Sequence, residues 1–143
     1  MILIVDTREQ KPYSNIFKKL KQNYLKKKLD IGDYSIKGFE TKFSIERKTL
    51  NDFICSITRE RQRFENELKK TKDFDYFALI IECSFYDIKN ENYFSKIEPS
   101  RILATIFNWS VKYNVPIFFV DTREGGALAV ITLAEGFMKY KNV

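Results

Sequence analysis

The feature that most constrains the fold of this chain is a near-continuous apolar run at residues 77–83, Phe-Ala-Leu-Ile-Ile-Glu-Cys. A run of this length and composition is typical of a central strand that is covered on both faces. Covering both faces requires helices on each side of the sheet. Because the rest of the chain alternates between strand-like and helix-like segments, we expect an α/β sandwich.

The remaining elements follow from hydrophobic periodicity and turn residues. Strands are expected at residues 1–5, 24–29, 32–36, 43–48, 77–83 and 116–120. Helices are expected at residues 12–20, 50–57, 60–70, 99–113 and 125–140, and residues 86–96 are expected to form a loop or a weak helix. The lysines of the second strand favour an edge position. Thr49 or Asn51 is expected to cap the helix at 50–57. These elements predict a single domain over residues 1–143.

Two carboxylates and a lysine gather on the strands at 32–36 and 43–48. Side chains at positions i and i+2 of a strand share a face, so Glu46 and Lys48 should point together with Arg47 on the other side. Antiparallel pairing through the turn at Lys37 and Gly38 could bring Asp33 beside Glu46. Such a set suits a divalent cation and a phosphodiester, as in the D…(D/E)-x-K arrangement of restriction-endonuclease-like nucleases. The alternative is a solvated ion pair contributing roughly 0–1 kcal/mol.

The chain contains no histidine. This excludes catalysis by Ser-His-Asp or Cys-His sets, the usual zinc sites and the histidine-based nucleases. General-base chemistry must come from carboxylates, a lysine or a metal-bound water, which leaves the carboxylate–lysine site as the candidate.

Three segments together resemble the XPF-type nuclease family, whose members are structure-specific endonucleases. They are "IVDTRE" at 4–9, "GDYSI" at 32–36 and "IERKTLNDF" at 45–53. The family pattern, G-D followed by E-R-K-x-x-x-D, corresponds to Gly32-Asp33 and to residues 46–52. The stretch "DFICSI" at 52–57, followed by Arg61 and Phe64, is also similar to the family's next helices. Tandem helix-hairpin-helix and helicase domains, common in the family, are not found in this sequence.

The resemblance implies a restriction-endonuclease-like (PD-(D/E)xK) three-layer sandwich with a mixed central sheet. It also implies Mg²⁺- or Mn²⁺-dependent hydrolysis of branched or flap DNA. The implied catalytic residues are Asp6, Asp33, Glu46, Arg47, Lys48 and Asp52. Some family members are inactive partner subunits, so a catalytically idle DNA-binding or scaffold module is the alternative function.

Within that set the implied roles differ. Asp33, Glu46 and Asp6 would bind the metal, and Lys48 would orient the attacking water. Arg47 would support the site. Strand alternation turns its side chain away from Glu46 and Lys48, so a bulge or a loop-facing geometry would be needed to bring it to the site. The sequence leaves both geometries open. Asp52 would hold Lys48 or Arg47. Arg8 and Glu9 are expected to support the site, by binding phosphate or adding oxygen ligands, although Arg8 could equally form a strand-end salt bridge.

The net charge of +6 is concentrated in two basic groups. Residues 11–28 contain lysines and no acid, and a second group lies at 59–72. Basic patches attract phosphate backbones. The predicted DNA-binding residues are Lys26, Lys27, Lys28, Arg59, Arg61 and Arg63. The alternative is that these side chains only keep the surface solvated.

The pentapeptide VDTRE occurs twice, at 5–9 and at 120–124. The flanking residues share little, which argues against a duplicated half-domain. In the second copy Asp121 or Thr122 is expected to cap the last helix, with Glu124 near the positive end of the helix dipole.

The last two helices carry more apolar residues than one buried face needs, which predicts a homodimer through them. The alternative is that both helices are core elements on opposite sides of the sheet. Cys55 and Cys83 lie in apolar stretches and are expected to be reduced core cysteines. No apolar run reaches the roughly 20 residues of a membrane span, and no signal peptide opens the chain. An intracellular location, cytoplasmic or at the nucleoid or nucleus, with no membrane partner is therefore expected.

Overall fold

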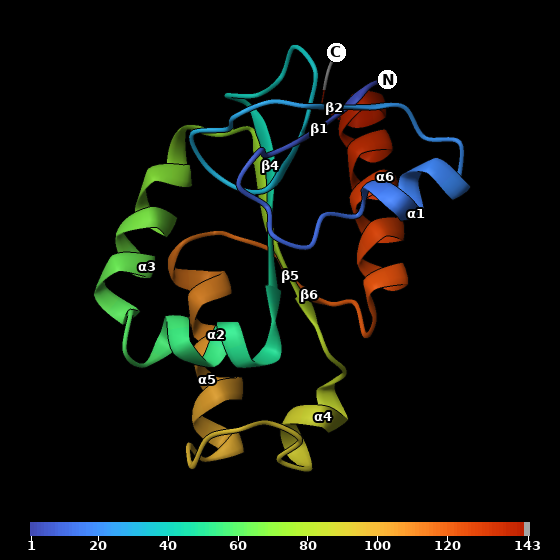
Figure 1. Ribbon diagram of the computed structural model, residues 1–143. Coiled ribbons are helices and arrows are strands. Elements are labelled where there is room, and N and C mark those ends of the chain that lie inside the picture. The colour runs from blue at the N-terminus through green and yellow to red at the C-terminus, as the bar shows by residue number, and fades with distance from the viewer. Residues whose placement is uncertain (142–143) are drawn as a thin grey trace.

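The computed structural model describes residues 1–141, which form a mixed six-stranded sheet between two layers of helices (Figure 1). The strand order is β2-β1-β3-β4-β5-β6. The strands are β1 (Leu3–Val5), β2 (Tyr24–Lys26), β3 (Tyr34–Ile36), β4 (Phe43–Thr49), β5 (Tyr76–Glu82) and β6 (Ile117–Phe119). Strand β3 runs antiparallel to β1 and β4, whereas β4, β5 and β6 are parallel to one another. The expected mixed sheet is confirmed.

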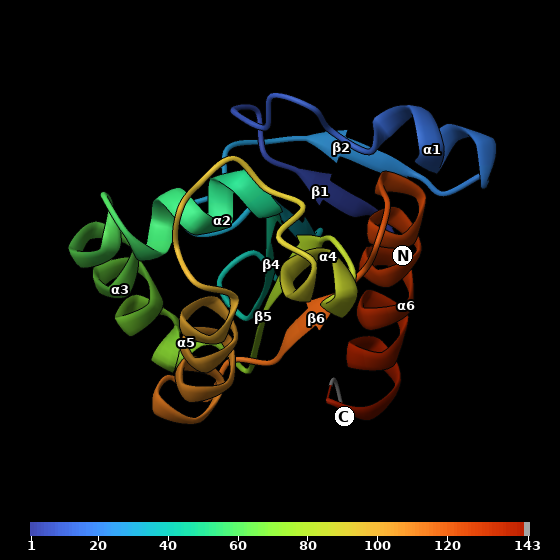
Figure 2. The same cartoon turned by 90° about the horizontal axis from the view of Figure 1, so that it is seen from below.

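The helices divide between the two faces of the sheet (Figures 1 and 2). On one face α1 (Ser14–Lys19) and α6 (Arg123–Tyr140) pack against β1, β3, β4 and β5. On the other lie α2 (Leu50–Ile57), α3 (Arg61–Lys69), α4 (Phe85–Lys89) and α5 (Pro99–Lys112), with the 3₁₀ turn η1 (Lys70–Asp73) after α3. Each face has its own apolar core.

Strand β5 lies inside the sheet because its apolar side chains are buried on both faces, as predicted from residues 77–83. Phe77 to Ile81 are buried, because alternate residues contribute to the two cores. Strand β4 pairs with β5 along its whole length, from Phe43 opposite Tyr76 to Thr49 opposite Glu82, without a bulge. The direction of every side chain on β4 therefore follows simple alternation.

Several boundaries differ from the sequence predictions. Strand β2 is an edge strand as expected but ends at Lys26. Residues 85–89 form the short helix α4, which agrees with the weak helix expected within 86–96 and begins one residue earlier. Helix α6 begins at Arg123, where the Thr122 hydroxyl accepts a hydrogen bond from the backbone N–H of Gly125. Thr49 caps α2 by accepting from the N–H of Asp52 at 3.2 Å. The cap of α2 is therefore Thr49 and not Asn51, and the cap of α6 is Thr122 and not Asp121.

Both cysteines are free, with Cys83 buried in the core and Cys55 half-buried. Burial raises the pKa of the Cys83 thiol to about 12. Among the helices of residues 1–141, none combines the length and the apolar character needed to cross a bilayer.

Candidate active site

Asp33 is held between two strands by backbone hydrogen bonds. Its N–H donates to the Ile45 carbonyl and its C=O accepts from the N–H of Asp6, both at 2.8 Å. The preceding Gly32 has a φ of +85°, and a Cβ there would lie 2.0 Å from the Ser44 hydroxyl oxygen. Glycine is therefore required at this position, and it turns the chain so that Asp33 enters the sheet opposite Glu46, one pair beyond Tyr34 and Ile45.

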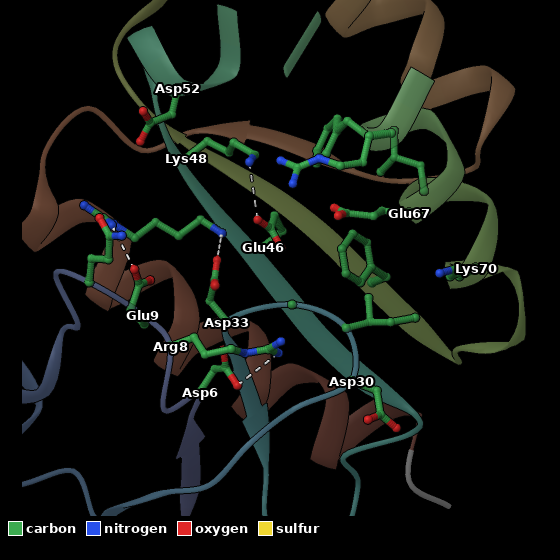
Figure 3. A pocket seen from close by; sticks show the side chains of 18 of the residues that line it. Asp6, Arg8, Glu9, Asp30, Asp33, Glu46, Lys48, Asp52, Glu67 and Lys70 are labelled. Carbon is green, nitrogen blue, oxygen red and sulfur yellow. Dashed lines mark hydrogen bonds and ion pairs between the residues drawn. The ribbon is translucent and has the colours of Figure 1, made fainter. Parts of the chain in front are cut away.

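Glu46 and Lys48 project from β4 toward α3, on the same face as Asp33 (Figure 3). The Lys48 ammonium lies 3.6 Å from a Glu46 carboxylate oxygen and 4.8 Å from the centre of the Phe64 ring. All three motif side chains line a cavity of about 860 Å³ between the sheet, α3 and the loops after β1 and β2. The predicted convergence of two acids and a lysine is thus present.

The carboxylates of this cavity carry negative charge that the protein compensates only in part. Burial raises the pKa of Asp33 well above its ordinary range, and repulsion from Glu46 and Glu9 adds to the effect. Burial likewise raises the pKa of Glu46 to about 7, against the attraction of Lys48 and with added repulsion from Glu67 and Glu9. Carboxylates in this condition are suited to receive a cation.

The Arg47 side chain points to the opposite face of β4, as simple alternation requires. Its guanidinium is 7% exposed and forms ion pairs with Glu82 at 2.7 Å and with Glu9 at 3.2 Å. Its backbone N–H, still on the site side, donates to an Asp33 carboxylate oxygen at 2.8 Å. Arg47 therefore touches the site through its backbone and through Glu9, while its charge lies beneath the sheet.

Glu82 is the centre of the buried network around Arg47. It accepts hydrogen bonds from both Arg47 and the Tyr13 hydroxyl. Burial opposes ionisation of Glu82, but the hydrogen bonds from Arg47 and Tyr13 outweigh it and lower its pKa. Arg123 stacks on the other side of this network, with its guanidinium 5.4 Å from the Tyr13 ring centre. It also donates to the Lys11 and Pro12 carbonyls at 2.8 and 3.1 Å.

Asp6 and Glu9, both from the first VDTRE copy, differ in how far their carboxylates are hydrogen-bonded. Asp6 is 4% exposed, and its carboxylate accepts from the Leu29 N–H at 2.8 Å and from Arg8 at 3.1 Å. Arg8 thus forms a salt bridge with Asp6 at the end of the strand, which was the alternative interpretation of the sequence. The Glu9 side chain is similarly buried, yet its Oε2 atom has no hydrogen-bond partner. Of the two, Glu9 has a buried carboxylate oxygen without a hydrogen-bond partner, and the residue is among those that line the cavity.

The other predicted site residues lie at different distances from the cavity. Asp52 lines it, but its carboxylate contacts neither Lys48 nor Arg47 (Figure 3). Arg63 lines the cavity and pairs with Glu60 at 2.5 Å. Arg61 and Arg59 are turned elsewhere, toward Trp109 and the Cys55 sulfur. Lys26, Lys27 and Lys28 lie at the β2 edge, where Lys27 pairs with Glu40 at 3.0 Å.

A search against known families finds the ERCC4 domain over residues 5–128. This chain belongs to the ERCC4 family. The family is one of structure-specific endonucleases, so the similarity to XPF-type nucleases predicted from three short motifs is confirmed.

Two further comparisons agree with the ERCC4 assignment. A Methanocaldococcus jannaschii protein, provisionally named an ATP-dependent RNA helicase, is 31% identical over 136 residues. The match covers 93% of this chain but only 15% of that protein. The solved structure of XPF from Aeropyrum pernix matches with a TM-score of 0.80 at 20% identity, over 100% of this chain and 64% of the other. The restriction-endonuclease-like fold is therefore confirmed.

The donor set of this ERCC4 domain fits a hard divalent cation in its chemistry. Asp33, Glu46 and Glu9 offer carboxylate oxygens, one of which is buried and unpartnered. Within residues 1–141, no three such side chains stand close enough to form a ready-made metal cage. Mg²⁺ is commonly held by one or two carboxylates together with waters and substrate phosphates. A small set of carboxylates that lines an open cavity is therefore suited to bind it.

Sequence reasoning missed several residues that the ERCC4 fold brings to the site. Glu67 lines the cavity from α3, and Figure 3 shows it projecting toward Glu46. Lys70 lines the cavity from η1; the sequence placed it in the second basic group but not at the site. The signal for them was helical spacing, since Arg63, Glu67 and Lys70 recur at intervals of four and three residues. Glu82, Tyr13 and Arg123 had no such local signal. Arg123 belongs to the second VDTRE copy, whose role is thereby tied to the loop that follows the first.

Proposed function

We propose that this chain is a divalent-metal-dependent endonuclease that hydrolyses phosphodiester bonds in branched or flap DNA. The observation that carries the proposal is the convergence of Asp33, Glu46 and Lys48 on one cavity of an ERCC4 domain. The same residues 1–143 would form one nuclease domain. An idle subunit has no need of this set, nor of two buried carboxylates with raised pKa values.

The roles of the residues follow from their contacts. Asp33 and Glu46 would hold Mg²⁺ or Mn²⁺, and Glu9 would add negative charge beside them, as its repulsion of both carboxylates indicates. Asp6, expected as a third ligand, has its carboxylate engaged by Leu29 and Arg8, so we assign it to fixing the loop beside the site. When bound, the cation would polarise the phosphoryl group and lower the pKa of a water.

Lys48 is positioned to act on the nucleophile. Its ammonium is held between the Glu46 carboxylate and the Phe64 ring, which fixes it on the cavity side of β4. From there it would orient the attacking water and offset charge that develops on the phosphate. Lys11, Arg63 and Lys70 line the same cavity and would hold the flanking phosphates of the strand.

The decisive test is the substitution Asp33→Asn, assayed on flap, fork and linear duplex DNA with Mg²⁺ and Mn²⁺. The change keeps the size of the side chain and removes its charge. We expect at least about a 100-fold loss of cleavage rate with the fold intact. Asp73→Asn, at an exposed position in η1, is the matched control and should cleave normally. Wild-type cleavage by Asp33→Asn would refute the assignment, and binding of flap DNA without cleavage by the wild type would favour the idle-subunit alternative.

We also propose that two copies associate through α5 and α6. Phe107 and Val111 on α5 are 54% and 83% exposed, and Leu128 on α6 is 60% exposed. Each helix therefore buries one stripe in the domain and leaves other apolar side chains in water, which is typical of an interface. A symmetric dimer is the commonest closed arrangement.

A further inference from the structure

The loop between α4 and α5, residues 90–98, presents the most exposed large apolar side chain of the described part of the chain. Phe94 is 95% exposed. Exposure alone does not mark a site, because single apolar residues are common on protein surfaces. What distinguishes Phe94 is the combination of a braced backbone and an anchor in the first turn of α2, next to residues that line the catalytic cavity.

The backbone that carries Phe94 is braced by hydrogen bonds along the loop. The Phe94 N–H donates to the Asn51 side-chain oxygen at 3.0 Å. The Tyr93 hydroxyl donates to the Ile97 carbonyl at 2.7 Å, and the Asn92 N–H donates to the Asp87 carbonyl at 2.8 Å. The Ile97 N–H donates to the Ser95 hydroxyl at 3.2 Å. A ring presented on a fixed backbone loses little conformational entropy when it meets a ligand.

The anchor of this loop lies at the rim of the catalytic cavity. Asn51 is in the first turn of α2, between Thr49 and Asp52, which both line the cavity. In Figure 2 the loop that follows α4 passes over α2. The backbone of Phe94 is therefore tied to the first turn of α2, which directly follows the Lys48 end of β4, and Phe94 itself does not line the cavity.

The segment around Phe94 carries charges of both signs, with Asp87, Glu91 and Glu98 beside Lys89 and Lys96. Lys89 and Lys96, on either side of Phe94 in the sequence, are exposed and make no ion pair with any residue from 1 to 141. Asp87 is the third residue of α4 and forms a capping box with the N-cap Ser84, whose N–H donates to its carboxylate. The free lysines can still meet phosphates that flank a base.

We propose that Phe94 stacks against an unpaired base of the DNA substrate, within a few nucleotides of the bond that is cut. This rests on the proposed nuclease function. Aromatic side chains are general stacking platforms, because every base offers a flat face whatever the sequence. Base faces are hidden inside a continuous duplex and accessible in a flap or at a junction. A stacking ring beside the cavity would therefore help the domain to prefer branched over linear DNA.

The first test follows stacking directly by fluorescence. The single native tryptophan, Trp109, is 3% exposed and should respond little to DNA. In Phe94→Trp, a single-stranded oligonucleotide added without divalent metal should quench the new tryptophan. Tyr140→Trp is the matched control, because Tyr140 is 69% exposed at the end of α6, at the opposite end of the molecule from the loop in Figure 1. Unchanged emission from the introduced indole of Phe94→Trp, while anisotropy shows binding, would overturn the inference.

The second test separates branched from linear substrates. Phe94→Ala should bind flap DNA about tenfold more weakly, within the range expected for one lost base–aromatic stack, and should bind blunt duplex within about twofold of wild type. Phe94→Tyr should retain flap binding. Equal losses on both substrates, or no loss on either, would overturn the inference.

The same variants separate base stacking from a protein interface at Phe94. If Phe94→Ala lowers self-association in sedimentation, the ring belongs to a protein interface and the stacking role is wrong. If the wild type cuts flap DNA and Phe94→Ala matches it, only the stacking role fails. If the wild type neither binds nor cuts any DNA, the proposed function fails and the stacking role fails with it.

Discussion

Replacing Glu46 with Gln should stabilise the metal-free protein at alkaline pH, although it removes a residue of the proposed active site. The Glu46 carboxylate is 18% exposed, and its pKa rises from an ordinary value of 4.5 to about 7, chiefly because of burial. Between these two values the unfolded chain has lost the proton that the folded chain still holds. The unfolded state then binds fewer protons, so stability falls as pH rises through this window.

The size of the effect follows from the shift. A difference of about 2.5 pH units corresponds to about 3 kcal/mol, since each unit is worth about 1.4 kcal/mol. The destabilisation caused by ionising Glu46 in the folded protein is almost complete at pH 8 and amounts to less than about 1 kcal/mol at pH 5. Glutamine keeps the size of the side chain and cannot ionise. It also leaves Lys48 without its 3.6 Å partner, an effect that works in the opposite direction. We therefore expect a gain of about 2–3 kcal/mol at pH 8.

The assay is urea denaturation of wild type and Glu46→Gln in EDTA at pH 5 and pH 8. Adding Mg²⁺ or Mn²⁺ at pH 8 should stabilise the wild type and narrow the gap, because a bound cation compensates the charge. Glu65→Gln is the control of opposite sign. Its pKa is lowered, chiefly by the hydrogen bond from Tyr113 and also by that from Lys112, so Glu65 stays ionised in the folded protein at both pH 5 and pH 8. This variant should therefore lose stability at both pH values and approach wild type only well below pH 4.5. A Glu46→Gln protein no more stable than wild type at pH 8 would refute the reasoning.

Three further predictions concern the network, the basic edge and association. Glu82→Gln leaves the Arg47 guanidinium without its main buried partner and should cost about 3 kcal/mol in the free energy of unfolding, measured in urea. Replacing Lys26, Lys27 and Lys28 with Gln should reduce the slope of log affinity for DNA against log salt by at most about 3, and an unchanged slope would return them to a solvating role. Sedimentation equilibrium at micromolar concentration should show a dimer, and a clean monomer near 17.0 kDa, with or without DNA, would contradict it.

The part of the site that the sequence predicts is the part governed by local rules. Asp33, Glu46 and Lys48 meet because two short strands joined by a turn pair in one register, and alternation then decides which side chains share a face. The central place of β5 is equally predictable, since Phe77 to Ile81 admit no solvent-facing position. The family likeness is visible for the same reason, because its motifs lie on β1, β3 and β4 or on the residues directly beside these strands.

The remainder depends on contacts between distant segments. The sequence could not decide how Arg47 supports the site, because its partners Glu82 and Glu9 lie 35 and 38 residues away. Glu67 was missed because its helical face has meaning only once α3 is placed over β4. Strand β2 is shorter than predicted, since its lysines have no buried face that would fix where pairing ends.

The hydrogen bonds from Arg123 to the Lys11 and Pro12 carbonyls join residues more than 110 positions apart. During synthesis, the loop that carries Glu9 leaves the ribosome long before the helix that fastens it. A nascent chain can thus contain the whole acidic motif while that loop is still unfastened. The domain can therefore hold Glu9 in its final place only after Arg123 has been made, so the acidic motif and its support arise at separate stages of synthesis.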